Sequence, residues 1–268
     1  MFKVTEYDLN SEVERVGLYQ DVVEKMQDRK KIISDRPRLK YEISEEERKQ
    51  RSLEASISRA RTRVRRLAQR YQLKYMWTLT FKETKVEVKN RNGSTSYYDT
   101  SNIDDVFKLW TSFLKRCSRA GIKFDYICTV EVQEKRLKKY GDKVYHFHFI
   151  TNKKLPVNNI QAIKMGYKKG ITELWGHGFT FVSKPRRSQE NKVYLYIVKY
   201  LTKLIEEMGV GRQRYRVSQG MYIPKEVYFL SSHLEFLKMG ETFTYTVLGD
   251  ELEIFFQVVK KEKGWDKC

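Results

Sequence analysis

The stretch KVYHFHFIT, residues 143–151, decides the fold that we expect for this chain. It holds two of only four histidines, His146 and His148, one residue apart inside an apolar run. A short apolar run predicts a buried β-strand, and the side chains of a strand alternate between its two faces. The two imidazoles therefore lie on the same face and can act on one object.

A second predicted strand, FDYICTVEVQ at residues 124–133, lies just before the histidine strand. Val130 and Val132 fall on one of its faces, and Glu131 falls on the other. A turn signal at 141–142 favours an antiparallel pair, joined by an extended basic loop, in which Glu131 meets the histidines across the ladder. Two imidazoles and one carboxylate leave positions open on a divalent metal ion, as a catalytic site requires. An H-x-H pair alone is more often two ordinary sheet residues, so the carboxylate is what favours a metal site.

The flanking segments predict further helices and strands and so indicate an α+β fold. Ser44 and Glu47 form a capping-box pattern at the start of a long amphipathic helix that extends to Tyr71. We expect the remaining elements at 74–83 and 178–184 (strands), 86–99 (hairpin), 101–117 and 191–209 (helices) and within 157–175 (short helices).

Weak patterning at the two ends sets the expected domain boundaries. Residues 44–208 form the main domain with a basic leading helix, residues 1–43 an N-terminal extension open to partial disorder, and residues 209–268 a C-terminal segment packed on it or appended to it. Three cysteines show no pairing pattern, and the charged first stretch lacks the apolar core of a secretory leader. No apolar run approaches the ~18 residues of a membrane span. We therefore expect a cytoplasmic protein without membrane insertion.

The composition indicates a nucleic-acid partner. The chain has 53 Lys and Arg residues against 34 Asp and Glu residues, a net charge of +19, together with 18 tyrosines and 4 tryptophans. Positive charge attracts phosphates, and aromatic rings offer faces on which bases stack. Solubility, or contact with anionic lipid, is the alternative reason for such a charge. We expect DNA contacts from a helical stripe and from the basic loop: Arg59, Arg63, Arg66, Arg70, Lys135, Arg136, Lys138 and Lys139.

The predicted helix at 191–209 gathers two phenols and two ammonium groups on one face. They stand at positions i, i+3, i+4 and i+7, within about 100° of one another on the helical wheel, and are Tyr196, Lys199, Tyr200 and Lys203. The apolar residues Val193, Ile197 and Leu201 turn toward the core. An ordinary amphipathic helix with half-buried tyrosines would show the same pattern.

Three motifs together resemble a known family. WTLTF at 77–81, VYHFHFI at 144–150 and YIVKYLTK at 196–203 are similar, in this order, to the motifs of rolling-circle replication initiators (Rep) of the HUH endonuclease superfamily. HUH denotes two histidines around a bulky hydrophobic residue, here His146-Phe147-His148. The resemblance spans residues 55–205 and is greatest to phage, plasmid and integrative-element initiators with a paired Y-x-x-K motif.

The resemblance implies a fold, a metal and a reaction. The fold is a central antiparallel sheet of about five strands, HUH/RRM-like and flanked by helices, which holds Mg²⁺ or Mn²⁺ on His146, His148 and Glu131. The reaction is site-specific nicking of single-stranded origin DNA by a tyrosine, which leaves a 5′-phosphotyrosine and a free 3′-hydroxyl, followed by strand rejoining. The connection after Glu131 is longer than in compact relatives, which leaves Gln133 and Glu134 as alternative third ligands.

The resemblance also assigns roles on the late helix. Tyr200 is the expected nucleophile and Tyr196 a second nucleophile for the terminating strand transfer, while Lys199 and Lys203 neutralise charge on the phenolate and the phosphate. Thr78 and Thr80 belong to the first motif, where the expected role is structural. We interpret the remaining histidines, His177 and His233, as surface or packing residues.

The expected partners follow from this reaction. They are single-stranded origin DNA, a host polymerase and a host helicase, because the sequence contains no G-x-x-x-x-G-K-[ST] motif for unwinding. The gene would belong to a phage, plasmid or integrated element of a bacterium. A relaxase or transposase of the same superfamily, and a DNA-binding module without catalysis, are the alternatives.

Overall fold

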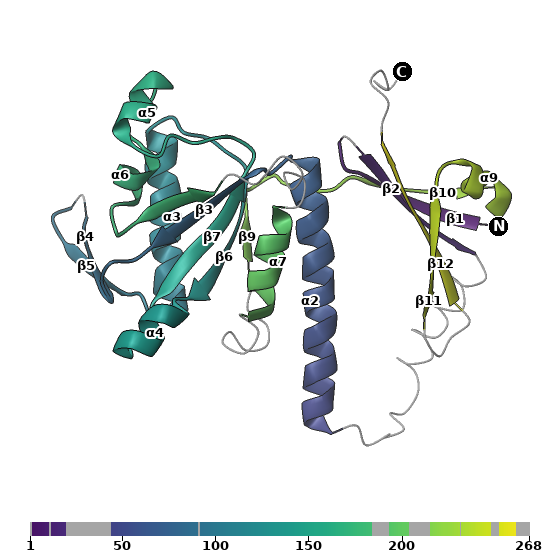
Figure 1. Ribbon diagram of the computed structural model, residues 1–268, viewed down its shortest axis with the longest axis horizontal. Helices are drawn as coiled ribbons and strands as arrows, with labels where there is room; N and C mark the ends of the chain where they lie inside the picture. The colour runs from purple at the N-terminus through teal and green to yellow at the C-terminus, as the bar shows by residue number, and fades with distance from the viewer. Residues whose placement is uncertain are drawn as a thin grey trace. The chain divides into compact units, whose positions relative to one another are not determined.

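The structure is a computed structural model that describes residues 2–10, 12–19, 44–90, 92–183, 193–203, 215–230, 232–247 and 252–260. These residues form antiparallel sheets and helices, which confirms the predicted α+β class. The chain divides into two compact units, each with its own five-stranded sheet (Figure 1). The histidine unit comprises Ser56–Ala68 and Gln72–Met221, and the terminal unit comprises Met1–Ala55, Gln69–Tyr71 and Tyr222–Cys268.

The sheet of the histidine unit has the strand order β8-β3-β7-β6-β9, and every neighbouring pair is antiparallel. The histidine strand β7 is central. Thr78 of β3 and Thr129 of β6 flank His148, while Thr80 of β3 and Glu131 of β6 flank His146. The strands are β3 (Tyr75–Thr80), β6 (Tyr126–Val132), β7 (Tyr145–Thr151), β8 (Thr180–Ser183) and β9 (Tyr215–Val217).

One face of this sheet, the core face, carries the large apolar residues of the alternating pattern. Phe147 and Phe149 of β7 pack there against Trp110 of α3, and Phe147 also contacts Trp175 of α6. Asn102 caps α3 as predicted, because its side-chain oxygen accepts hydrogen bonds from two backbone N–H groups of the first turn. Burial of these rings on one face directs the histidines between them to the other.

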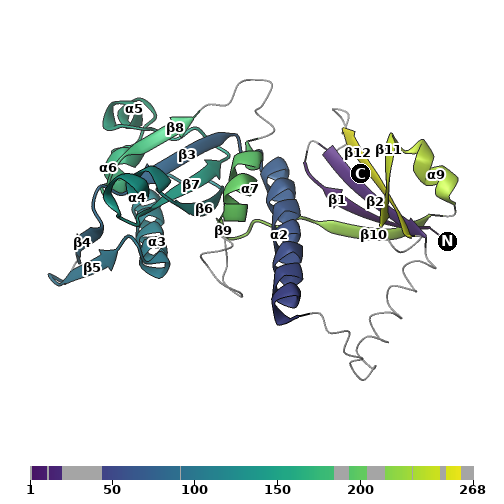
Figure 2. The same ribbon diagram turned by 60° about the horizontal axis from the view of Figure 1, so that its bottom comes forward.

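The opposite face, the site face, carries the two histidines and is covered by α7, which packs on β6 and β7. Ile197 and Leu201 of α7 are buried, on the predicted side of the helix. Helices α3 and α7 therefore cover opposite faces of the sheet (Figures 1 and 2). The helices after β5 in this unit are α3 (Ile103–Arg119), α4 (Glu134–Tyr140), α5 (Asn159–Lys164), α6 (Ile171–Trp175) and α7 (Tyr194–Lys203).

The basic segment between β6 and β7 is not the extended loop that the sequence predicted, because most of it forms helix α4. Glu134 lies in the first turn and Lys138 and Lys139 in the last, an arrangement that the helix dipole favours. Gly141 ends the helix with φ of 74°, a left-handed conformation that glycine adopts without strain.

The predicted hairpin also differs in detail. Its strands β4 (Lys85–Lys89) and β5 (Thr95–Asp99) form a separate two-stranded sheet and do not extend the edge of the central one. The long helix α2 (Glu45–Arg70) begins where expected, since Ser44 Oγ accepts a hydrogen bond from the backbone N–H of Glu47. None of the helices in the described part of the chain has the length and apolar character that a membrane span requires.

The terminal unit combines both ends of the chain in one antiparallel sheet of order β10-β1-β2-β12-β11. Two strands come from the expected N-terminal extension and three from the expected C-terminal segment. Phe2, Phe236 and Phe255 form the centre of its small core with Val4. The elements are β1 (Phe2–Asp8), β2 (Glu12–Tyr19), β10 (Lys225–Leu230), α9 (His233–Lys238), β11 (Thr242–Val247) and β12 (Leu252–Lys260).

Candidate metal centre and tyrosine site

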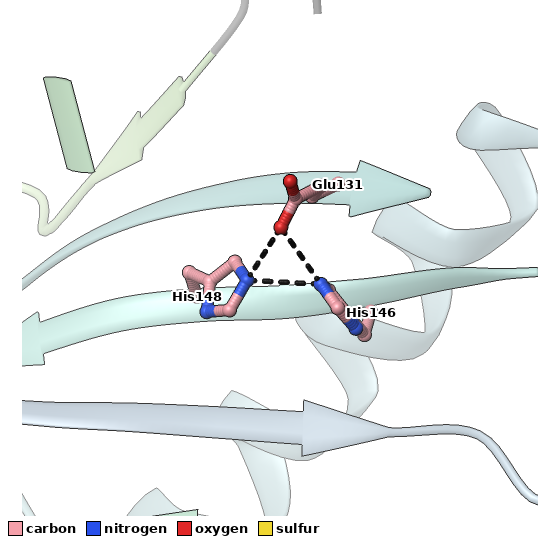
Figure 3. A group of neighbouring side chains, drawn as sticks. All are labelled: Glu131, His146 and His148. Carbon is pink, nitrogen blue, oxygen red and sulfur yellow. Dashed lines mark hydrogen bonds and ion pairs between the residues drawn. The ribbon is translucent and has the colours of Figure 1, made fainter. Parts of the chain in front are cut away.

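Glu131, His146 and His148 converge on one point of the site face (Figure 3). The register makes Glu131 the cross-strand neighbour of His146, and strand alternation returns His148 to the same face. Glu131 Oε2 lies 3.1 Å from His146 Nε2 and 3.0 Å from His148 Nε2, and the two Nε2 atoms are 2.9 Å apart. All three side chains are mostly buried, so the group is shielded from much of the solvent.

This donor set fits a divalent cation with octahedral coordination. Ligands at 90° around an ion lie about 3.0 Å apart when each is ~2.1 Å from it. Around a tetrahedral ion with ligands at ~2.05 Å the separation would be about 3.3 Å. The observed separations of 2.9, 3.0 and 3.1 Å match one triangular face of an octahedron. Such a triangle leaves three coordination positions for other ligands.

Two threonines of β3 support the site in ways that the sequence did not predict. Thr78 Oγ1 lies 3.1 Å from His148 Nδ1. When Nδ1 carries the proton and donates it to this hydroxyl, the lone pair of Nε2 is directed at the metal position. The hydroxyl of Thr80 instead bonds β8, since it donates to the carbonyl oxygen of Phe179 and accepts from its backbone N–H. The alternation of WTLTF was the only sequence signal that both hydroxyls share the histidine face.

Helix α7 brings Tyr200 to the metal-ligand cluster. The Tyr200 ring is stacked on the His148 imidazole, with ring centroids 3.9 Å apart and an angle of 6° between the planes. The phenol and the cluster come from segments more than fifty residues apart in the sequence, and the packing of α7 on β6 and β7 unites them. A phenol held this close could attack a phosphate bound at the cluster.

The other predicted residues of α7 are less closely joined to the cluster. Tyr196, one turn before Tyr200, is 47% exposed, and Lys199 is also exposed. Lys203 is the last residue of the helix, and its side chain lies outside what the structure describes. Tyr200 is thus the phenol of this helix with a direct contact to a candidate metal ligand.

A pocket of about 760 Å³ opens beside the cluster. His146 and Glu131 lie in its wall, and α4 supplies much of the remainder, including Lys135 and Lys139. Arg136 also lines it, although its guanidinium group donates to the carbonyl oxygens of Phe81 and Lys82 and pairs with Asp142. Lys138, the fourth basic residue predicted here, is exposed and is not part of the pocket wall. The complete wall is Lys82, Glu131, Val132, Gln133, Glu134, Lys135, Arg136, Lys139, Tyr140, Asp142 and His146.

The two alternative third ligands lie outside the cluster. The side-chain amide of Gln133 donates to the carbonyl oxygen of Tyr145, and Glu134 is the exposed first residue of α4. Among the described acidic residues, Glu131 is the one that the structure brings to both histidines.

The predicted arginine stripe of α2 divides into two kinds of residue. Arg59 and Arg63 are exposed and Arg66 is partly buried. Arg70 is held in the terminal unit, where it donates to the carbonyl oxygen of Asp8 and pairs with its carboxylate. The first two are therefore the most accessible to DNA.

His177 is a packing residue, as expected. Its ring lies beside Phe81 and Trp175, and Arg116 donates to its Nε2 at 3.2 Å. Burial, and then the charge of Arg116, lowers the pKa of His177 to about 4. The imidazole is therefore neutral at pH 7. The side chain of His233 lies outside the described residues.

The comparison with known families agrees with this arrangement. Residues 74–205 match the model of a family of replication-associated proteins, described as the ORF2 type. No curated protein and no solved structure matches the chain. The matched range begins just before β3 and ends just after α7, so it contains the ligand cluster and Tyr200. The similarity of this segment to replication-associated proteins supports a role as a replication initiator.

Proposed function

We propose that this protein initiates rolling-circle replication as a tyrosine nickase of the HUH type. It cuts single-stranded origin DNA, keeps the 5′ end as a phosphotyrosine and releases a 3′-hydroxyl that primes synthesis. The observation that carries the proposal is the stacking of Tyr200 on His148, because it joins a nucleophile to a candidate metal ligand. The family match over residues 74–205 supports the replicative setting.

In this proposal Glu131, His146 and His148 hold Mg²⁺ or Mn²⁺ through Oε2 and the two Nε2 atoms. When bound, the divalent cation polarises the scissile phosphate and offsets the negative charge that develops on it. Thr78 keeps the Nδ1 proton of His148 engaged, so that Nε2 remains a ligand and not a donor.

Tyr200 carries out the covalent step. A free phenol has a pKa of ~10, so the site must favour the phenolate. Tyr200 Oη loses its proton to solvent and bonds to phosphorus, the bond from phosphorus to the 3′-oxygen breaks, and that oxygen takes up a proton. Lys199, exposed on the same helix, contributes positive charge. The phosphotyrosine retains the energy of the ester, so a later attack by a 3′-hydroxyl rejoins the strand and restores Tyr200.

Tyr196 is suited to a second transfer at the end of the replication cycle. It lies one turn before Tyr200 and is accessible from solvent. While Tyr200 holds the first 5′ end, Tyr196 can receive the second. Duplex unwinding and synthesis would come from a host helicase and a host polymerase.

The test uses a single-stranded origin oligonucleotide and Mn²⁺, followed by denaturing electrophoresis. The wild type should form a covalent adduct that requires the metal ion, and Tyr200→Phe should abolish the adduct of the first cleavage. Tyr194→Phe on the same helix serves as the matched control and should retain it. Full adduct formation in Tyr200→Phe, or loss only in Tyr196→Phe, would contradict the assignment of Tyr200.

A further inference from the structure

Strand β8 exposes two large aromatic side chains that the proposed chemistry does not use. Phe179 and Phe181 are 74% and 66% exposed. Val182, between them and the strand end, is partly buried and packs against the core of the histidine unit. The strand thus uses one of its faces for the core and presents phenylalanine to solvent on the other.

The register of the sheet places these rings on the site face. Phe181 is the cross-strand neighbour of Thr78, which is the neighbour of His148. The next row begins at Phe179, whose backbone bonds Thr80, the neighbour of His146. Cross-strand neighbours project to the same side of a sheet. Each phenylalanine therefore stands in line with one histidine, with a threonine between them.

The spacing suits the nucleotides beside a phosphate at the metal-ligand cluster. Neighbouring strands lie ~4.8 Å apart, so two strand spacings put each phenylalanine about 10 Å from its histidine along the row. Figure 2 shows β8 at the edge of the sheet, next to β3 and opposite β9.

The backbone beneath the rings is held firmly. The Thr80 hydroxyl bonds both backbone groups of Phe179, and Trp175 Nε1 donates to the carbonyl oxygen of Thr80 at 2.8 Å. A Cβ atom on Gly178 would lie closer than 3.0 Å to backbone atoms of Thr80 and Lys82, so this close approach requires glycine. The two rings are thus presented from a fixed edge.

We propose that Phe179 and Phe181 form a stacking platform for two bases of the single-stranded DNA whose phosphate lies at the cluster. This assignment rests on the proposed function for the location of that phosphate. Exposed rings on a sheet bind bases through their faces, and this contact tolerates any base. The net charge of +19 favours a polyanionic occupant for an apolar surface beside such a site.

The experiment measures binding without cleavage. The full chain is titrated in EDTA with a fluorescent single-stranded oligonucleotide, and its anisotropy gives the affinity. Phe179→Leu and Phe181→Leu should each weaken binding about tenfold, whereas replacement of either residue by Trp should retain it. Tyr97→Leu is the control, because Tyr97 is 71% exposed but lies on β5, outside this sheet.

A second measurement locates the bases. The oligonucleotide carries 2-aminopurine at successive positions, and stacking on a ring quenches its fluorescence. The wild type should quench two neighbouring positions, and each leucine variant should restore fluorescence at one of them. Unchanged affinity and unchanged quenching in both leucine variants would overturn the platform. A change in oligomeric state with unaltered DNA affinity would also overturn it, since the rings would then contact a second copy of the chain.

These outcomes are separable from those of the proposed nickase. Tyr200→Phe should keep both the affinity and the quenching, because neither needs a covalent step. If the wild type forms no adduct while the leucine variants bind weakly, the nickase is rejected and the platform stands. If the adduct forms while the leucine variants bind normally, the platform is rejected and the nickase stands.

Discussion

Thr78 shows how a single hydroxyl can control a metal ligand that it does not replace. Its hydroxyl lies 3.1 Å from His148 Nδ1, and this contact favours the tautomer that carries its proton on that nitrogen. Loss of such an outer partner commonly lowers metal affinity about 10- to 100-fold. We therefore expect Thr78→Val to weaken Mn²⁺ binding by this factor, as measured by calorimetry.

Thr78→Ser provides the matched control, since it retains the hydroxyl and should bind Mn²⁺ nearly as well as the wild type. Equal affinity in the valine and serine variants would show that the threonine only fills space.

His177 predicts a pH effect on stability that is separate from the site. Its folded pKa of about 4 lies below the unfolded value of ~6.5, so between these pH values the unfolded chain binds more protons. The stability contributed by neutral His177 is complete above pH ~6.5 and is lost as the pH falls toward 4. His177→Gln retains an acceptor for Arg116 but does not titrate. Urea unfolding at several pH values should show a shallower decline for this variant than for the wild type, and parallel curves would contradict the assignment.

At the scale of elements, helix α4 converts a basic segment into one wall of a pocket. Lys135 and Lys139 lie in that wall, whereas Lys138 on the same helix does not. If the wall contacts DNA phosphates, each lost lysine removes one contact. We expect Lys135→Ala and Lys139→Ala each to reduce the slope of log affinity against log salt by ~0.7 for single-stranded DNA.

Lys138→Ala is the control for this series because it removes the same charge from the same helix. Its salt slope should change less than that of the wall variants. Equal changes in all three variants would indicate that only the net charge of the helix matters.

At the scale of the whole molecule, the chain builds two units with separate cores. The histidine unit holds the candidate metal ligands, and the core of the terminal unit centres on Phe2, Phe236 and Phe255. We expect two unfolding transitions. Mn²⁺ at 100 times its dissociation constant should stabilise one transition by about 2.7 kcal/mol, and Phe236→Ala should lower the other by about 3–5 kcal/mol.

Scanning calorimetry of the full chain, with and without Mn²⁺, checks this assignment. A single transition that responds equally to the metal ion and to Phe236→Ala would contradict independent units.

Local periodicity was enough to predict the elements of the histidine unit. The alternation around His146 and His148, the cap at Asn102 and the buried side of α7 all follow from residues within a few positions of each other. The same kind of pattern failed for α4, where charged residues suit a helix and a loop equally well. It also failed at the chain ends, because β1 pairs with β10 across more than two hundred residues.

The sequence by itself determined which side chains share a face: the two histidines with Glu131, and Tyr200 with Lys199. Only the tertiary structure decided which faces meet, namely that Tyr200 stacks on His148, that Thr78 reaches Nδ1 and that Phe179 and Phe181 continue the histidine rows. The physical reason is range. Backbone geometry repeats every two or 3.6 residues and can be read locally, whereas strand register and helix docking are decided by burial between segments far apart in the chain.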